Sequence, residues 1–370
     1  MQDTRDPPSA TTDGIDESYR AAPTLDAEAV PGPSAVGTGT ADSRGTTATE
    51  PAPTRTTATE PNDSTDTADA SGRVRSLIGF ASGSPFVAAI AAVETVIATV
   101  LLGVPLSPAP AVVGFVAFAV YTVDHVADAA ADARSTPERA RLARRYADQL
   151  MIAAAVAYGL AVALSTLAGP LALGVALLPG AFWIAYASDW LPNAGRAVRS
   201  LAPDDGLAAA PRVPRLKDVP VVSSLVVAAG WALAVTLLPL AFADAVSPTP
   251  AVGVAFAYFL LRSFVDTELP NVRDVAADTA AGVTTLPIAL GVAGTRRVLY
   301  GVDLAAAATL TAATATGVLA PGIAAALGVG IAASLAVTAL AGRVDDDAVL
   351  GVAPDCSYLV VAAALLLVAA

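Results

Sequence analysis

The sequence predicts an all-α polytopic membrane protein, a bundle of about nine transmembrane helices. Hydrophobic residues make up 55% of the chain and charged residues 15%, whereas soluble domains average about 45–50% and about 25%. From Ser84 onward, apolar stretches recur that are long enough, as helices, to cross about 30 Å of hydrocarbon. These stretches are too continuous for the alternating strands of a barrel, and backbone groups in lipid must be satisfied within the protein. Helices are therefore expected throughout.

Residues 1–74 come before the first apolar stretch and are expected to form a disordered, acidic, Thr/Pro/Ala-rich cytoplasmic tail. The first 70 residues hold thirteen acids and four arginines, and the sequence TTATEP begins at Thr46 and again at Thr56. Such a segment buries too little apolar surface to offset its chain entropy. It also lacks the basic start and apolar core of a secretory signal. Residues 75–370 are expected to form the membrane domain.

Nine apolar segments within that domain are predicted to span the membrane, with short polar connections between them. The expected spans cover residues 84–104, 108–127, 147–167, 169–188, 219–243, 248–268, 298–318, 321–341 and 353–370.

The basic residues predict the orientation of these spans, because cytoplasmic loops carry the excess of Lys and Arg. Arginines or lysines occur before the first span and after the second, fourth, sixth and eighth, whereas the other connections contain none. We therefore expect a multi-pass protein of the cell membrane with its amino terminus in the cytoplasm and its carboxy terminus outside.

The composition also excludes several functional classes. A single cysteine, Cys356, and a single histidine, His125, exclude a disulfide framework and metal sites built from thiolates or several histidines. A bound metal would need oxygen ligands. No basic stripe is available to neutralise successive phosphates, so nucleic acid is not an expected partner.

The first group of residues that suggests chemistry follows the second span. Asp124, Asp128 and Asp132 are spaced four apart, so a helix that continued beyond the membrane would carry all three on one stripe. Carboxylates in such a row repel one another unless a cation lies over them, and Mg²⁺ commonly binds through carboxylates and substrate phosphates. The alternative interpretation is a solvated helix end on an acidic protein.

A second acidic group follows the sixth span, on the same predicted side of the membrane. Asp274 and Asp278 are again four residues apart, with Asn271 just before them. Pro270 is expected to kink or end the sixth helix, and Gly282 with Pro287 indicates a turn before the seventh. The two acidic groups would face each other across the bundle and hold metal ions around a diphosphate.

These residues resemble the UbiA-type intramembrane prenyltransferases. Asp124, Asp128 and Asp132 are similar to the first Asp-rich motif of that family. The second motif and the segment after it are similar to Asn271, Arg273, Asp274, Asp278, Gly282, Thr285, Leu286 and Pro287. The basic loop with Lys217 and the polar sequence from Arg134 to Arg139 also resemble the family, over roughly residues 75–370. With one lysine among 21 basic residues, the composition is similar to that of archaeal, salt-adapted members.

The resemblance implies a Mg²⁺-dependent transfer of a polyprenyl group from an allylic polyprenyl diphosphate to a lipophilic acceptor within the membrane. It implies that the ion is held by Asp124, Asp128, Asp132, Asp274 and Asp278, which form the catalytic set. It implies diphosphate binding by Asn271, Lys217, Arg215, Arg134 and Arg273. A quinone precursor, an isoprenoid lipid or a carotenoid is expected as acceptor.

The sequence also departs from the family pattern. Asp124 replaces the usual Asn of the first motif, and Ala277 and Thr279 replace the Gly and Arg that commonly flank the last Asp of the second. A catalytically silent membrane scaffold on the same fold is therefore one alternative. A secondary transporter is another, although transporter sites usually lie near the bilayer midplane.

Two further polar residues fall in or near the predicted spans. His125 is expected to be an interfacial side chain rather than a ligand. Glu94 lies in the middle of the first span, where a carboxylate is rare and is commonly functional. We expect it to face the bundle interior, where it would orient an acceptor, take up a proton or pair with a polar neighbour.

Overall fold

The computed structural model describes residues 83–130, 133, 136–187, 221–244, 247, 249–344 and 347–369. The N-terminal tail predicted for residues 1–74 lies outside this set, as do Asp132, Arg134, Arg215 and Lys217. In the described part of the chain the secondary structure is helical, with one isolated bridge between Ala341 and Val344. The predicted all-α fold is confirmed.

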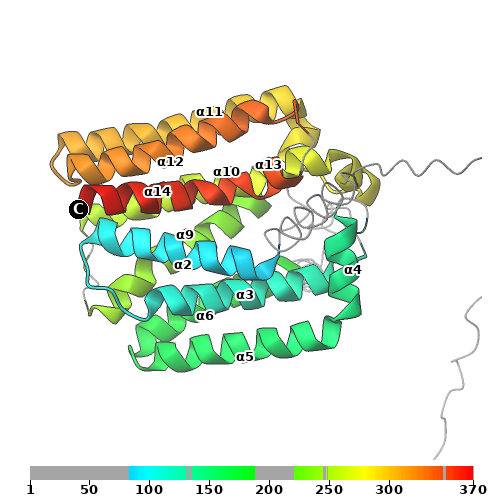
Figure 1. The fold of residues 1–370 in the computed structure, drawn as a ribbon, viewed down its shortest axis with the longest axis horizontal. Helices are drawn as coiled ribbons and strands as arrows, with labels where there is room; N and C mark the ends of the chain where they lie inside the picture. Colours follow the sequence, from blue (N-terminus) through cyan, green and yellow to red (C-terminus); the bar gives the residue numbers. More distant parts are fainter. Residues whose placement is uncertain are drawn as a thin grey trace, which may run out of the picture. The chain divides into compact units, whose positions relative to one another are not determined.

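In the part of the chain that the structure describes, nine helices of 17 or more residues correspond to the nine predicted spans, and two short helices accompany them (Figure 1). The long helices are α2 (Ser84–Leu102), α3 (Ala109–Ala127), α5 (Ala147–Thr166), α6 (Pro170–Ala187), α9 (Val222–Phe242), α10 (Pro250–Ala281), α11 (Leu286–Ala315), α12 (Pro321–Leu340) and α14 (Ala353–Ala369). The short ones are α4 (Pro137–Arg145) and α13 (Asp347–Gly351).

Among the described helices, six are long and apolar enough to cross a membrane by length and composition: α2, α3, α5, α9, α11 and α12. Helices α6 and α14 contain shorter apolar stretches, and α10 carries Arg262 in its otherwise apolar first half and Asp266 directly after it. Some large apolar side chains are strongly exposed, such as Leu167 at 80% and Leu367 at 81%. Exposed side chains of this kind are expected where helices face lipid rather than water.

The helix ends follow local residue chemistry. Proline occupies the first turn of α2, α3, α4, α10, α11 and α12, where its missing amide would have no helical partner anyway. Helix α10 ends at Gly282, whose φ of 71° is left-handed, a conformation that glycine adopts without steric penalty. The turn predicted before the seventh span is therefore present.

Of the kink or helix end expected at Pro270, the structure rules out the end, and the second helix does not continue in the way that an acidic stripe would need. Pro270 does not end the sixth helix, because α10 runs through it for 32 residues. Loss of a single backbone hydrogen bond at proline leaves the rest of that helix intact. The first acidic stripe does not continue along α3, because that helix ends at Ala127 with Asp128 as its C-cap. Acidic side chains oppose the dipole at a helix C-terminus, which favours ending the helix there.

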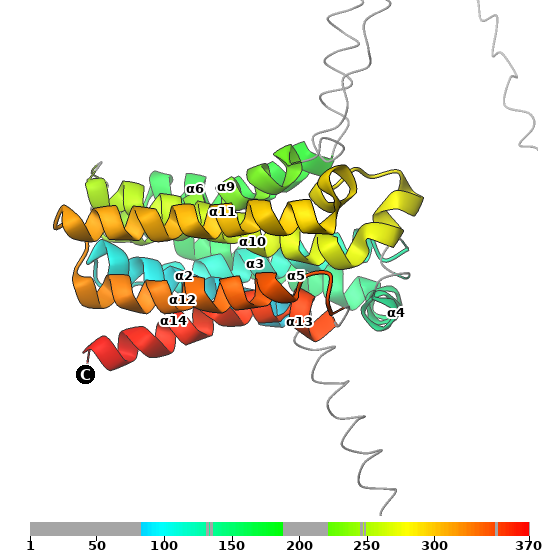
Figure 2. The same cartoon turned by 90° about the horizontal axis from the view of Figure 1, so that it is seen from above.

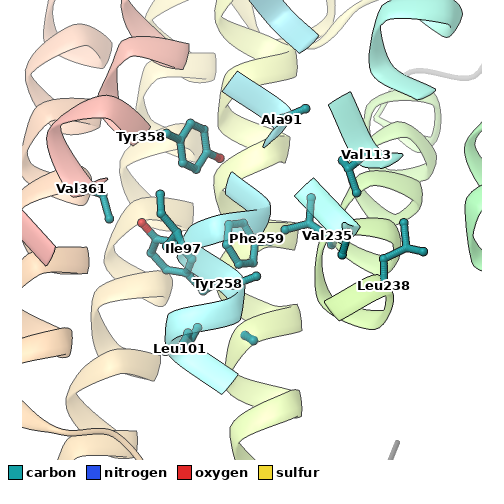
Figure 3. Packing of buried hydrophobic residues seen from close by; sticks show 14 of the residues in the cluster. Ala91, Ile97, Leu101, Val113, Val235, Leu238, Tyr258, Phe259, Tyr358 and Val361 are labelled. Carbon is teal, nitrogen blue, oxygen red and sulfur yellow. The ribbon is translucent and has the colours of Figure 1, made fainter. Parts of the chain in front are cut away.

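Consecutive long helices alternate in direction, and α10 packs against α2, α9, α11, α13 and α14. Figure 3 shows the centre of the bundle, where Ile97 of α2, Val235 of α9 and Tyr258 and Phe259 of α10 are buried together. Small residues allow close helix approach: a Cβ at Gly114 of α3 would lie 3.1 Å from the Ala88 carbonyl oxygen of α2. Close backbone packing of this kind is a common source of helix association in membranes.

Candidate functional site

The two acidic groups lie at the same end of the helix bundle. Figures 1 and 2 place the C-terminal end of α3 and the C-terminal half of α10 at this end, together with α4 and α13. We call it the acidic end, defined by Asp124, Asp128, Asp274 and Asp278. The arrangement agrees with the prediction that segments about 140 residues apart are brought to one side of the protein.

The first acidic group is held by the end of α3. Asp124 lies in the last turn, and the Trp183 indole nitrogen of α6 donates a hydrogen bond of 3.2 Å to its Oδ1. Asp128 is exposed, and its backbone amide donates to the Asp124 carbonyl at 2.8 Å. His125 instead turns to α2, with its Nδ1 3.2 Å from the Ser84 hydroxyl. This position fits the predicted interfacial role of the histidine.

The second acidic group lies on the last turns of α10. Arg273 donates from Nε to Asp274 Oδ1 at 2.8 Å and from Nη2 to Asp274 Oδ2 at 2.6 Å. Asn271 donates to Glu268 Oε2 at 3.1 Å. Arg273 and Asp274 thus form a two-pronged ion pair, a strong and directional contact.

Asp278 lies one turn further along α10, and its surroundings are different. Its Oδ2 is buried without a hydrogen-bond partner among the described residues. Burial, followed by the nearby charge of Asp274, raises the pKa of Asp278 to about 6. A buried oxygen without a donor is unfavourable, so this atom is suited to accept a cation or a donor group from a ligand.

The described residues do not assemble a complete metal site by themselves. Within them, no three His, Cys, Asp or Glu side chains lie close enough to hold an ion. The predicted ligand Asp132 and the predicted diphosphate-binding residues Arg134, Arg215 and Lys217 fall outside the described residues. Of the predicted site, the structure therefore places Asp124, Asp128, Asn271, Arg273, Asp274 and Asp278 at one end of the bundle.

The bundle interior contains a second polar region, which the sequence analysis did not predict. Arg262 of α10 is fully buried and donates to Asp303 of α11 at 3.0 Å and to Asp266 at 3.2 Å. We call the group of Arg262, Asp266, Asp303, Ser334, Ser357 and Tyr358 the Arg262 network. The i, i+4 spacing of Arg262 and Asp266 inside an apolar run was the available local signal.

The other members of the Arg262 network come from α12 and α14. The Ser334 hydroxyl donates to Asp303 Oδ2 at 2.9 Å, and the Tyr358 hydroxyl donates to Asp266 Oδ2 at 2.9 Å. Arg262 also donates to the Ser357 hydroxyl at 2.8 Å. The network therefore connects four helices through charge-assisted hydrogen bonds in an apolar environment, where such bonds are strong.

Comparison with known proteins gives matches at the level of family and fold. Residues 248–344, which include α10 and the second acidic group, match the family model of the VviA prenyltransferases. No curated protein matches by sequence.

Among solved structures, a UbiA homologue from Archaeoglobus fulgidus bound to GPP and Mg²⁺ aligns with a TM-score of 0.50 at 14% identity, over 78% of this chain and 100% of that chain. A digeranylgeranylglyceryl phosphate synthase structure aligns with a TM-score of 0.45 at 14% identity, over 75% of this chain and 92% of that one.

The family match covers the helix that carries the second acidic group, and the solved UbiA homologue shares the arrangement of helices. Over residues 248–344 the chain is therefore similar to the prenyltransferase family, and its fold is that of the solved UbiA homologue.

Proposed function

We propose that this prenyltransferase moves a polyprenyl group from an allylic polyprenyl diphosphate to a lipophilic acceptor within the membrane, in a Mg²⁺-dependent reaction. The observation that supports this most is the joint location of Asp124, Asp128, Asp274 and Asp278 at one end of the bundle. The UbiA homologue of similar fold was solved with GPP and Mg²⁺, which supports the same ligand classes here.

The chemistry of the acidic end fits a magnesium ion. Its donors are carboxylate oxygens, the ligands that Mg²⁺ prefers, and Asp278 contributes a buried oxygen that lacks a partner among the described residues. Asp124, Asp128, Asp132, Asp274 and Asp278 are the proposed ligands. When bound, the ion supplies Lewis-acid stabilisation of the charge that develops on the departing diphosphate.

Cationic and amide side chains near these acids are proposed to bind the diphosphate. Arg273 already forms a two-pronged contact with the Asp274 carboxylate, and the same guanidinium geometry fits two phosphate oxygens. It would exchange Asp274 for the diphosphate, assisted by Asn271, Arg134, Arg215 and Lys217. These donors would stabilise the negative charge of the leaving group as the carbon–oxygen bond breaks.

The apolar bundle is proposed to hold the prenyl chain and to keep water away from the allylic cation. Interior positions are occupied by apolar side chains of α2, α3, α9 and α10, among them Ile97, Val113 and Phe259 (Figure 3). Exclusion of water prevents hydrolysis of a reactive intermediate. The proposed acceptor is a quinone precursor, an isoprenoid lipid or a carotenoid.

The proposed orientation places the acidic end at the cytoplasmic surface. Arginines occur in α4, in the C-terminal half of α10, in the N-terminal half of α11 and directly after α12, and Figure 1 shows these segments at this end. Connections 103–108, 167–169, 243–249 and 316–320 contain no basic residue. Cytoplasmic loops carry such an excess. The amino terminus would then be inside and the carboxy terminus outside.

A direct assay tests the proposal. Purified protein in lipid nanodiscs receives Mg²⁺, geranylgeranyl diphosphate and, in turn, a phenolic quinone precursor, a geranylgeranylglyceryl phosphate or an acyclic carotenoid. We expect diphosphate release with at least one acceptor and none in EDTA. Full activity in EDTA, or no release with any acceptor, would contradict the proposal and favour the scaffold or transporter alternatives. Lipid and pigment profiling of a deletion strain would identify the natural acceptor by the precursor that accumulates.

A further inference from the structure

Asp124 lies where a helix by itself holds a side chain poorly. It is in the last turn of α3, which ends at Ala127. The ends of helices fray, and a negative charge near the C-terminus opposes the helix dipole. A metal ligand, in contrast, needs one fixed orientation, which neighbouring residues commonly supply by hydrogen bonds. The contacts of Asp124 with other helices therefore bear on its proposed role.

Helix α6 provides a contact of this kind. The Trp183 indole nitrogen donates to Asp124 Oδ1 at 3.2 Å, and both side chains are half-buried. An indole N–H group can only donate, and it points in one direction from a rigid ring. Because the acceptor is a carboxylate, the bond is stronger than one between neutral groups. Trp183 therefore restricts the rotation of the Asp124 carboxyl group.

The residue before Trp183 packs the same turn of α6 against α9. Phe182 lies against the buried Gly230 of α9, where an added Cβ would be 2.7 Å from the ring carbon Cδ2. The missing side chain at Gly230 is what allows the Phe182 ring to come so close, as small residues do between membrane helices. Trp183 thus extends from a turn of α6 that is closely packed on its neighbour.

A third contact connects α9 back to α3. Trp231, next to Gly230, stacks on Tyr121 with 6.0 Å between ring centroids and 15° between the ring planes. Tyr121 is three residues before Asp124, so the two are neighbours on the surface of α3. Each pair among helices α3, α6 and α9 is therefore joined by one contact. We call the residues that make these contacts the Asp124 frame: Tyr121, Asp124, Phe182, Trp183, Gly230 and Trp231.

The simpler explanation of the Trp183 contact is packing, because a partly buried tryptophan usually bonds its N–H group to a nearby acceptor. Two features favour a role in the site. The acceptor is a proposed metal ligand, and the Asp124 frame also holds α3 itself, through Tyr121, one turn before that ligand. The two explanations predict different results when Asp124 is absent.

We propose that Trp183 is a positioning residue, whose N–H group holds the Asp124 carboxylate in the orientation that binds the metal ion. The proposal rests on the proposed function, because it takes Asp124 as a ligand of the ion. It adds α6, a helix whose residues include no acid, to the elements that build the site. The contact is open to either Asp or Asn at position 124, since the side chains of both carry an oxygen that accepts a hydrogen bond.

The Mg²⁺ dependence of donor binding, measured without an acceptor, tests the proposal. Full-length protein in nanodiscs binds labelled geranylgeranyl diphosphate over a series of Mg²⁺ concentrations, which gives an apparent Kd for Mg²⁺. Trp183→Phe keeps an aromatic ring but removes the N–H group. We expect the apparent Kd to rise by about 10–100-fold, the usual effect of losing a residue that orients a metal ligand.

The same substitution in the Asp124→Ala background separates positioning from packing. There the group on which Trp183 acts is absent, so Trp183→Phe should change the apparent Kd by less than about threefold. If Trp183 served packing alone, its loss would have the same effect in both backgrounds.

Tyr158→Phe is the matched control, because it also removes one polar group from an aromatic side chain that contacts α6. The Tyr158 hydroxyl would lie 2.5 Å from a Cβ at Gly180, three residues before Trp183. This variant should keep the apparent Kd for Mg²⁺ within about threefold of the wild-type value. The unfolding midpoint in detergent is measured for every variant.

A rise of less than about tenfold for Trp183→Phe would overturn the proposal, as would a rise of more than about threefold that persists in the Asp124→Ala background. Trp183→Phe protein that unfolds in both backgrounds would also overturn it, because the indole would then support helix packing. Wild-type protein that binds no donor at any Mg²⁺ concentration would instead contradict the proposed function, and the role of Trp183 with it.

Discussion

The two polar regions of this bundle differ in how completely their hydrogen bonds are satisfied. In the Arg262 network, Arg262, Asp303 and Asp266 are each bonded to at least two partners from the same group. At the acidic end, Asp128 is exposed and Asp278 has a buried oxygen that lacks a partner among the described residues. In the Arg262 network the acids are paired and only the Arg262 Nε lacks a partner among the described residues. A network of paired charges stabilises a fold, whereas incompletely satisfied acids are suited to a ligand.

The largest expected effect is on stability, from breaking the Arg262 network. Arg262→Met leaves Asp303 and Asp266 buried without their cation, so we expect a loss of about 3–5 kcal/mol in the free energy of unfolding. Denaturant titration in detergent would measure it. Arg297→Met is the control, since Arg297 is exposed and should change stability by less than about 0.5 kcal/mol. Equal losses in the two variants would remove the distinction between the regions.

The second effect is on activity, at the incompletely satisfied region. Asp128→Ala should lower the rate of diphosphate release by at least about 100-fold, because a charge that stabilises the transition state is lost. Stability should change by less than about 1 kcal/mol, since Asp128 is exposed. Glu138→Ala, at an exposed acid in the first turn of α4, should keep wild-type activity. A wild-type rate for Asp128→Ala would remove Asp128 from the metal site.

A smaller effect is expected from Ser334→Ala, which removes one hydrogen bond of the Arg262 network. The lost donor to Asp303 should lower the unfolding free energy by about 1.5–3 kcal/mol, as for hydrogen bonds to charged groups. Ser165→Ala is the comparison, because Ser165 is also fully buried but donates to the Ala161 carbonyl of its own helix. If Ser165→Ala is the more destabilising of the two, the Arg262 network is not the stabilising element inferred here.

The smallest effect is expected from Asp124→Asn, which introduces the residue usual in the family. The amide oxygen can still accept the hydrogen bond from Trp183, and one negative charge is removed from a crowded group. We expect the rate of diphosphate release to change by no more than about tenfold, or about 1.4 kcal/mol. A loss as large as that of Asp128→Ala would show that the negative charge of Asp124 is essential in this chain.

The sequence was sufficient to predict the fold because each span is a long apolar run, and length alone decides whether a helix can cross a bilayer. The sequence was also sufficient to predict that Asp124 and Asp274 lie at the same end of the bundle. The two residues are at or just beyond the ends of two spans, the second and the sixth, that run in the same direction. The extent of α10 was not predicted, because a proline such as Pro270 can either kink a helix or end it and the sequence alone does not choose between the two. The Arg262 network was missed although Arg262 and Asp266 form a local i, i+4 pair, because its other members Asp303, Ser334 and Ser357 lie on three further helices and form no pattern in the sequence.

Pro270 has a consequence for the chemistry of α10. Proline has no amide hydrogen, so the backbone carbonyl of Asp266, four residues earlier in the same helix, lacks its usual helical donor. This oxygen sits between the ion-paired interior half of the helix and the half that carries Asp274. The Asp266 carbonyl oxygen can therefore accept a hydrogen bond from water. The helix also bends more easily at Pro270 than elsewhere along its length.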